Sequence, residues 1–277
     1  MLTKMKKSSV IAILAFASLA GAQPARTIVV TSPGSPGSTD DAQPRMDSFA
    51  GAVSARAHTQ LGAVYEPSDA AGARRLAESG IGIVSLPFFL AHEQELGLRP
   101  RLQVVAKGRP ALDTWALVAQ KGRVSSAKGL AGVSIVSSVA FAPGFVRGDV
   151  LASLGQVPES TQIVQSTSVL SALRRAAAGE PVAVVLDGAQ QASLASLPFA
   201  SKLEVVAKSP EMPAALVVTI DRKVSGKDWA ALEPALLGLD AKGASEGALA
   251  GIEVTRFEHL DDKALAAARK AYGNARP

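Results

Sequence analysis

The stretch LAESGIGIVSLP, residues Leu76–Pro87, decides the fold of this chain. Gly80 is a residue type that commonly ends a helix, so the helix before it is predicted to stop there. The run that follows, Ile81–Leu86, is almost continuously apolar, which is typical of a strand with both faces buried. Pro87 suits the first turn of a new helix. A helix, a buried strand and a second helix in direct succession indicate an α/β fold.

The same alternation continues on both sides of this stretch. Before it, the first strand is predicted at Thr27–Thr31, followed by a loop rich in Ser, Pro and Gly. After it, the alternation starts afresh at Val133–Ser137. Two starts predict two lobes, each with a mainly parallel sheet flanked by helices. The other predicted strands are Ala63–Tyr65, Leu102–Ala106, Thr114–Ala119, Thr161–Val164, Val182–Leu186, Leu203–Ala207 and Ala215–Ile220, and the predicted helices are Pro44–His58, Ala70–Ser79, Pro87–Leu96, Pro143–Leu154, Ser166–Ala178 and Gly188–Ser196.

The two lobes are predicted to be discontinuous in sequence. Residues 23–120 and 214–277 are expected to form lobe 1, and residues 121–213 are expected to form lobe 2. The chain then crosses between the lobes near Gln120 and again near Ser209–Pro213. The remainder of the chain after the last strand is predicted to be entirely helical. Because these helices bring no strands of their own, we expect them to pack on the sheet of lobe 1.

The first 22 residues have the features of a secretory signal peptide. Three lysines precede an apolar run, Val10–Ala17, and the small residues Ala20 and Ala22 follow it. We expect cleavage after Ala22 and export of the mature protein. The apolar run is shorter than the roughly 20 residues of a membrane-spanning helix, so no stable membrane insertion is expected.

Charge and composition exclude several classes of protein. The chain has 277 residues, with 29 Lys and Arg against 24 Asp and Glu. Loss of the signal peptide removes three lysines, which leaves 26 basic against 24 acidic residues and a net charge of only +2. The mature sequence has no cluster of basic and aromatic residues, so nucleic-acid binding is not expected. The chain has no Cys, which excludes disulfides, thiolate nucleophiles and zinc–thiolate sites.

Four segments of the chain, taken in order, form a recognisable set. They are Leu76–Pro87, Trp115–Gly122 with Ser126–Gly132, Ala172–Ala183 with Asp187, and Ser209–Pro213. This ordered set resembles the substrate-binding proteins of phosphate/phosphonate-type ABC transporters. The resemblance implies the two-lobed type II periplasmic binding protein fold. It also implies a monomeric periplasmic protein, without a cofactor, that closes on a small anionic or polar ligand by hinge motion and delivers it to a membrane ABC permease.

The candidate ligand-binding residues fall where strands end and helices begin. In such a fold, backbone N–H groups and short hydroxyls at these ends attract an anion. The candidates are Ser32, Ser35 and Ser38 on the first loop, Ser85 after the third strand, Ser137 and Ser138 after the first strand of lobe 2, the aromatic residues Phe88, Trp115 and Phe141, and Asp187 after a buried strand, with Tyr65 as a further candidate. Each also has an ordinary alternative, because a serine or aspartate before a helix caps it and an aromatic ring fills the core.

The loop after the first strand of lobe 2 departs from the family pattern. Relatives that bind phosphonates usually carry Ser/Thr-Ser-Gly at the start of the helix that follows. Here Ser137 and Ser138 are followed by the apolar stretch Val139–Phe145. A more hydrophobic organic ligand therefore stays open as an alternative.

Two other functions are compatible with the same fold. The chain could be the sensor domain of a membrane kinase. A periplasmic enzyme is less well supported, because the sequence lacks G-x-S-x-G, H-E-x-x-H and the phosphate-binding glycine motifs. Its three histidines, His58, His92 and His259, are too scattered for a metal-ligand motif. No catalytic residue and no metal site are expected.

Overall fold

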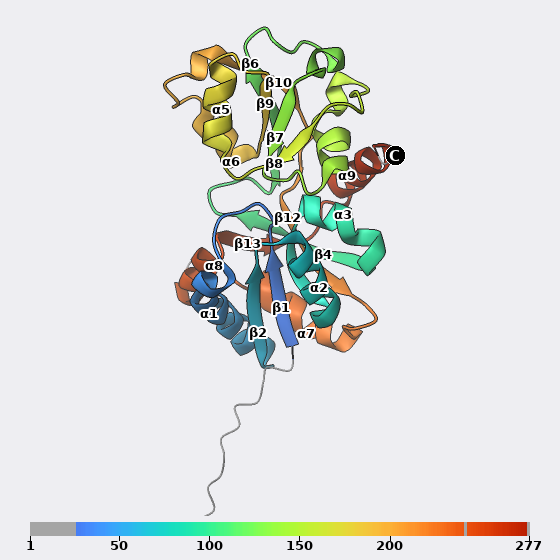
Figure 1. Cartoon of the computed structure of the whole chain (residues 1–277). Coiled ribbons are helices and arrows are strands. Elements are labelled where there is room, and N and C mark those ends of the chain that lie inside the picture. Colours follow the sequence, from blue (N-terminus) through green and yellow to red (C-terminus); the bar gives the residue numbers. More distant parts are fainter. Residues whose placement is uncertain (1–25, 241–242, 276–277) are drawn as a thin grey trace, which may run out of the picture.

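Two β-sheets divide the molecule into two lobes, stacked one above the other in Figure 1. The computed structural model describes residues 26–240 and 243–275. The predicted signal peptide and its cleavage site after Ala22 lie outside these residues. Within the described ranges, none of the helices has the length and apolar character needed to cross a membrane.

Lobe 1 contains, among the described residues, a six-stranded sheet with the order β13-β4-β12-β3-β1-β2. Strands β1, β2 and β3 are parallel, whereas β12 is antiparallel to β3 and β4, and β13 is antiparallel to β4. The sheet is therefore mixed: its β2-β1-β3 part is parallel, as expected of the predicted mainly parallel sheet, and its other pairings are antiparallel. The strands are β1 (Arg26–Thr31), β2 (Leu61–Glu66), β3 (Ile81–Ser85), β4 (Leu98–Ala106), β12 (Ala215–Ile220) and β13 (Val254–Glu258).

Lobe 2 contains a five-stranded sheet within the described ranges, with the order β10-β6-β9-β7-β8. It too is mixed, because β7 is parallel to β8 and β9 whereas β6 is antiparallel to β9 and β10. The strands are β6 (Ala116–Gln120), β7 (Ser134–Ser137), β8 (Ile163–Gln165), β9 (Val182–Leu186) and β10 (Leu203–Lys208). A short antiparallel pair, β5 (Leu112–Asp113) and β11 (Met212–Pro213), joins the two segments that cross between the lobes.

Strand β6 corrects the predicted boundary between the lobes. The first crossing was expected near Gln120, but β6 pairs with β9 and β10 and therefore belongs to lobe 2. The chain crosses one strand earlier, at β5. The partner of Ala116 is Leu186, far along the sequence, and local patterning carries no information about such a pairing.

The helix–strand–helix order predicted for Leu76–Pro87 is confirmed. Helix α2 ends at Gly80, whose φ of 81° lies in the left-handed region that glycine adopts without strain. Strand β3 follows with four of its five residues buried, and α3 begins directly after it with Pro87 in its first turn. The helices are α1 (Thr39–Ala57), α2 (Asp69–Ser79), α3 (Leu86–Leu96), α4 (Pro143–Phe145), α5 (Val169–Ala177), α6 (Gly188–Leu194), α7 (Gly226–Leu237), α8 (Glu246–Gly251) and α9 (Asp262–Asn274).

The predicted helix over Pro143–Leu154 is interrupted. Helix α4 continues into a π-helical turn over Val146–Val150 and then a 3₁₀ turn over Ala152–Leu154. Gly144 and Gly148 lie in this region, and glycine weakens an α-helix by about 1 kcal/mol relative to alanine. Both glycines let another helix, α9, approach the backbone closely.

The C-terminal helix α9 packs on lobe 2 rather than on the sheet of lobe 1. A Cβ on Gly148 would overlap the Ala271 carbonyl oxygen, so the two backbones are in direct contact. Arg269 of α9 also reaches lobe 1, where its Nε lies 3.1 Å from Glu93 Oε2 on α3. The prediction that all C-terminal helices pack on lobe 1 is wrong for α9, because its Ala271 meets Gly148 of lobe 2, a residue distant in sequence that local patterning does not reveal.

Strand β13 was not predicted, because the end of the chain was expected to be entirely helical. It forms the edge of the lobe 1 sheet beside β4. The pairing register shifts between Val254 and Arg256, and this irregularity interrupts the alternation by which a half-buried strand is recognised.

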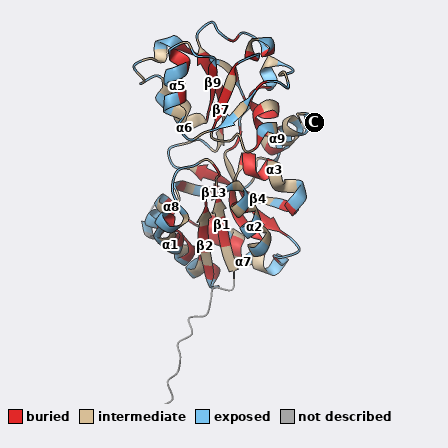
Figure 2. Cartoon of the chain, viewed as in Figure 1, coloured by how far each residue is buried: buried red, intermediate tan, exposed pale blue. Residues whose placement is uncertain are grey.

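Buried residues fill the strands of both sheets, as the red segments of Figure 2 show. The largest hydrophobic cluster is continuous between the lobes and includes Phe88 and Phe89 of α3, Trp115 at the crossing, and Phe145 of α4. A second cluster lies between the lobe 1 sheet and the helices α1 and α7, and a third lies between the lobe 2 sheet and α5. Packed side chains therefore join the lobes on the side of α3, α4 and α9.

The close contact between α9 and lobe 2 predicts that Gly148→Ala destabilises the protein. The added methyl group would overlap the Ala271 carbonyl oxygen and lie 2.8 Å from Ala275 Cβ, and overpacking of this kind costs about 1–3 kcal/mol. Gly273→Ala, in α9 but with no atom within 4 Å of the added Cβ, is the matched control and should be neutral or stabilising. Urea denaturation measures both; equal stabilities would contradict this packing.

Candidate functional site

The loop after β1 and the turn after β7 meet between the lobes. A Cβ on Gly34 would overlap the Ser138 carbonyl oxygen and lie 2.8 Å from the Ser138 carbonyl carbon. Figure 1 shows the loop after β1 on the side of lobe 1 that faces lobe 2. Ligands of open α/β sheets bind at the carboxyl ends of strands, and this contact brings two such ends together. We name this region the interlobe site: the loop Ser32–Ser38, the turn Ser137–Phe141 and the strand ends beside them.

The loop Ser32–Ser38 holds three of the predicted serines. The Ser32 and Ser35 hydroxyl oxygens lie 3.0 Å apart, and the Ser35 N–H donates to the Ser32 carbonyl at 3.0 Å. Ser38 caps α1 by accepting a bond from the Asp41 N–H at 3.2 Å. Ser35 and Ser38 are both exposed, but the Ser38 hydroxyl donates its proton to Asp41 Oδ2 at 2.6 Å and so has none left for a ligand.

Two buried hydroxyls at strand ends have no hydrogen-bond partner among the described residues. Ser85 is the last residue of β3 and precedes α3, yet its hydroxyl makes no capping bond and is buried. The Tyr65 hydroxyl, near the end of β2, is buried in the same way. Burial raises the pKa of Tyr65 more than nearby Arg45 lowers it, so the phenol stays protonated and can donate. Because β1 lies between β2 and β3, the two hydroxyls flank the strand that leads into the loop.

The lobe 2 turn is shaped by hydrogen bonds within the lobe. Ser137 is fully buried, and its hydroxyl accepts a bond from the Val139 N–H at 3.1 Å. Ser138 is partly exposed, and its carbonyl accepts a bond from Gln165 Nε2 at 2.6 Å. The half-buried Phe141 donates its N–H to Gln165 Oε1 at 2.9 Å. The turn therefore offers Ser138 and Phe141 to the interlobe site, whereas Ser137 supports the turn from inside.

Two of the predicted aromatic residues belong to the core. Phe88 has no exposed surface, and its ring lies 4.5 Å from the ring of His92. Trp115 is 5% exposed and packs edge-on against Phe145, with ring centroids 5.2 Å apart. Neither ring offers a surface to a ligand in this structure. We therefore correct the predicted role of both: the alternative, that such rings fill the core, applies to them.

Asp187 is engaged by the protein itself. One of its carboxylate oxygens accepts a bond from the Gln190 N–H at 2.9 Å and so caps α6. The other lies 3.0 Å from Nη2 of Arg109, on the loop before β5, and Nη1 of the same guanidinium lies 3.0 Å from Asp113. Asp187 thus acts as a helix cap and as one end of an ion-pair bridge to lobe 1.

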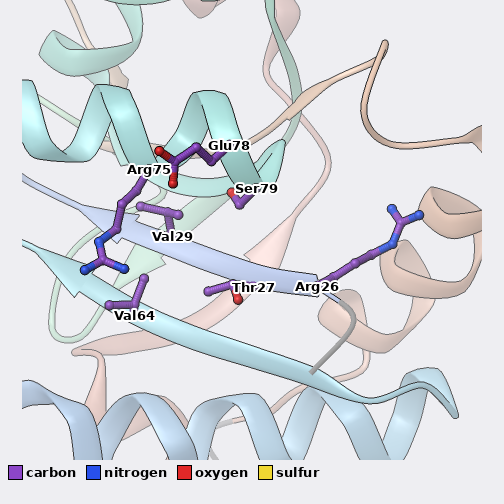
Figure 3. A pocket seen from close by; sticks show the side chains of 7 residues that line it. All are labelled: Arg26, Thr27, Val29, Val64, Arg75, Glu78 and Ser79. Carbon is purple, nitrogen blue, oxygen red and sulfur yellow. The ribbon is translucent and has the colours of Figure 1, made fainter. Parts of the chain in front are cut away.

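Two surface pockets lie away from the interlobe site. The first, of about 280 Å³, lies beside α2 and β1, and Figure 3 shows that the Arg26 side chain points away from its other lining residues. The second, of about 320 Å³, lies between α3 and α9. The lining residues are Arg26, Thr27, Val29, Val64, Arg75, Glu78 and Ser79 in the first, and Leu90, Glu93, Gln94, Arg269, Tyr272 and Gly273 in the second. None of them is a predicted ligand-binding residue, and Arg75 is already paired with Glu66.

Asp149, in the π-helical turn of lobe 2, is the described carboxyl group with the most perturbed acidity. Its side chain is 1% exposed, and neither carboxyl oxygen has a hydrogen-bond partner among the described residues. Burial raises the pKa of Asp149 to about 8. The described part of the chain contains no group of three or more His, Asp or Glu side chains that could hold a metal ion.

Comparison with known sequences places the chain in a family. The sequence model of the ABC transporter, phosphonate, periplasmic substrate-binding proteins matches residues 81–265. The chain belongs to this family. The resemblance seen in the four sequence segments is thereby confirmed. Family members capture a solute in the periplasm for an ABC transporter. No curated protein sequence matches the chain.

Solved structures show the same fold at low sequence identity. A binding protein component of an ABC phosphonate transporter from Pseudomonas aeruginosa is 18% identical, with a TM-score of 0.65 over 91% of this chain and 87% of that chain. A Xanthomonas citri protein bound to ATP is 13% identical, with a TM-score of 0.69 over 90% and 98%. PhnD1 from Prochlorococcus marinus, in complex with methylphosphonate, is 15% identical, with a TM-score of 0.59 over 90% and 98%. The chain therefore has the two-lobed type II periplasmic binding protein fold of its family.

Two residues of the region were not found from the sequence. Gln165 is the last residue of the short strand β8, in a polar stretch, and Arg109 follows a turn with another basic residue nearby. Neither position carries a local signal, because both side chains act on partners that are brought near only by the tertiary fold. A search for polar residues at every strand end would have included Gln165.

Asp149 predicts how stability depends on pH. The folded protein holds a proton at Asp149 up to about pH 8, whereas an unfolded chain releases it near pH 3.8. This difference in pKa adds to the free energy of unfolding. The added free energy is fully present below pH 3.8 and is lost as the pH rises to about 8, by up to about 1.4 kcal/mol per pH unit. Asp149→Asn, which has no proton to lose, should show a flatter profile in urea denaturation between pH 5 and 8. Parallel profiles of the two proteins would contradict the assignment.

Proposed function

We propose that the interlobe site binds a small oxyanion of the phosphonate or phosphate type. One observation carries this proposal: the buried hydroxyls of Ser85 and Tyr65 have no partners among the described residues, and they belong to the two strands that flank β1. A buried donor without a partner costs about 1–3 kcal/mol, and an anionic ligand would remove this cost. The accessible hydroxyls of Ser35 and Ser138 supply further donors, whereas the Ser38 hydroxyl donates to Asp41 Oδ2 at 2.6 Å.

Helix α3 adds a favourable electrostatic field to these donors. It begins at Leu86, directly after Ser85, and has 11 residues. The Leu86 N–H donates to the Ala214 carbonyl at 3.0 Å, while the positive end of the helix dipole stays at the Ser85 end. An anion beside Ser85 is therefore stabilised by both the hydroxyl and the helix end.

The arrangement supports binding rather than catalysis. A serine nucleophile requires a base within hydrogen-bond reach. The Ser85 hydroxyl has no such partner in the described part of the chain. Phe141, half-buried beside Ser138, gives the site one apolar wall that suits the organic substituent of a phosphonate.

The location and the partner that we propose follow from the family. Its members are periplasmic substrate-binding proteins of ABC transporters. We further propose that residues 1–22 direct export, that cleavage follows Ala22, and that the mature protein delivers its ligand to the permease as a monomer.

Calorimetry on the exported protein, freed of ligand by unfolding and refolding, tests the proposal. Inorganic phosphate, methylphosphonate, sulfate and acetate form the panel. We expect saturable binding of phosphate or methylphosphonate and weaker binding of acetate, which has fewer oxygens for the donors. Absence of binding to every member of the panel, or a preference for acetate, would contradict the proposal.

Ser85→Ala should weaken binding without destabilising the fold. A hydrogen bond to a charged group contributes about 1.5–3 kcal/mol, so the dissociation constant should rise about tenfold or more. Because the Ser85 hydroxyl has no partner in the described protein, its removal should leave the melting temperature unchanged or raise it. Ser48→Ala, on the exposed face of α1, is the matched control and should change neither value. Unchanged affinity in Ser85→Ala would remove Ser85 from the site.

A further inference from the structure

Gly34 makes a contact between the lobes that no other residue type can make. Its φ of +87° lies in the left-handed region. A Cβ at this position would overlap the Ser138 carbonyl oxygen and would lie 3.2 Å from Gln165 Nε2. The backbone of lobe 1 therefore rests directly on the lobe 2 turn and on the side-chain amide of Gln165, the last residue of β8.

The local structure of the loop presents Gly34 in this position. The Ser35 N–H donates to the Ser32 carbonyl at 3.0 Å, which closes a four-residue turn, and the two hydroxyl oxygens are 3.0 Å apart. Pro33 and Gly34 occupy the central positions, and proline followed by a glycine with positive φ is the sequence of a type II turn. The turn is thus a rigid projection of lobe 1.

Gln165 prepares the surface that receives this projection. Its amide spans the lobe 2 turn: Nε2 donates to the Ser138 carbonyl at 2.6 Å, and Oε1 accepts from the Phe141 N–H at 2.9 Å. The two bonds hold the Ser138 carbonyl in place from one side while Gly34 approaches it. Gln165 is exposed at the end of β8 and serves no core packing.

We propose that Gly34 and Gln165 form the closing contact of the two lobes, with Gln165 as the positioning residue for the turn that Gly34 meets. This inference rests on the proposed function, because closure matters where a ligand is enclosed. The apparent affinity of such a protein scales with the fraction of molecules that reach the closed arrangement. If loss of the contact lowers that fraction tenfold, the dissociation constant rises tenfold.

Gly34→Ala tests the contact, and Gly122→Ala, in the turn after β6, is its matched control. Both glycines have positive φ, +87° and +78°, so alanine strains the backbone at both positions. An added Cβ has no atom within 4 Å in the control, whereas it overlaps the Ser138 carbonyl oxygen in Gly34→Ala. We expect at least a tenfold weaker affinity for methylphosphonate or inorganic phosphate in Gly34→Ala and less than a threefold change in Gly122→Ala. Equal effects in the two variants would overturn the proposal.

Gln165→Ala tests the positioning role in a residue that is not part of the core. We expect Gln165→Ala to weaken ligand affinity and to leave the melting temperature unchanged. The double variant with Gly34→Ala should bind no more weakly than Gly34→Ala alone, because both changes remove the same contact. Gln165→Glu keeps an acceptor for the Phe141 N–H but loses the donor to Ser138, and should behave like Gln165→Ala. Additive losses in the double variant would overturn the coupling.

Small-angle X-ray scattering separates this proposal from the proposed function. The radius of gyration of Gly34→Ala, measured with and without 10 mM methylphosphonate, should exceed that of wild type and of Gly122→Ala. This comparison does not require binding, so it stands if the wild type binds no member of the anion panel. Equal radii in all three proteins would contradict the closing contact, whereas absence of binding with different radii would contradict the proposed function alone.

Discussion

The burial of strand β3 on both faces is the constraint on which the rest of the structure depends. Buried backbone N–H and C=O groups must be paired, so β3 needs a hydrogen-bonded neighbour on each edge. One neighbour is β1, which is parallel, and the other is β12, which is antiparallel and returns from lobe 2. The lobe 1 sheet is therefore complete only after the chain has built lobe 2. The same strand ends at Ser85, so the pairing that fixes β3 also fixes a hydroxyl at the interlobe site.

The connections between the lobes differ on their two sides. On the side of α3, α4 and α9, the lobes share a hydrophobic cluster and the Arg269–Glu93 ion pair. At the interlobe site the backbone of Gly34 contacts Ser138 and the Gln165 amide. Apolar burial contributes far more per residue than a single backbone contact. We therefore expect relative motion of the lobes to be easiest at the interlobe site, where we propose that a ligand is admitted and enclosed.

The sequence was sufficient for features that depend on local order, and insufficient where distant partners decide. Helix α2, strand β3 and helix α3 follow from Gly80, an apolar run and Pro87 in succession. By contrast, β6 belongs to lobe 2 because it pairs with the distant strand β9, where Ala116 faces Leu186. Strand β13 was not predicted because a shift of register beside Arg256 interrupts its alternating pattern. The sequence predicted which serines lie at strand ends, but not which of their hydroxyls have hydrogen-bond partners in the protein. The Ser85 hydroxyl has no partner among the described residues, whereas the Ser137 hydroxyl accepts a bond from within its own turn.

The central claim is that an oxyanion sits between the lobes against hydroxyls that the protein leaves without partners in its described part. A crystal structure of the exported protein grown with methylphosphonate tests this claim most directly. The account predicts electron density for the ligand within hydrogen-bond distance of the Ser85 and Tyr65 hydroxyls, with the Ser138 turn on its other side. Density in the pocket beside Arg75 and Glu78 instead, with the interlobe site empty, would contradict the account.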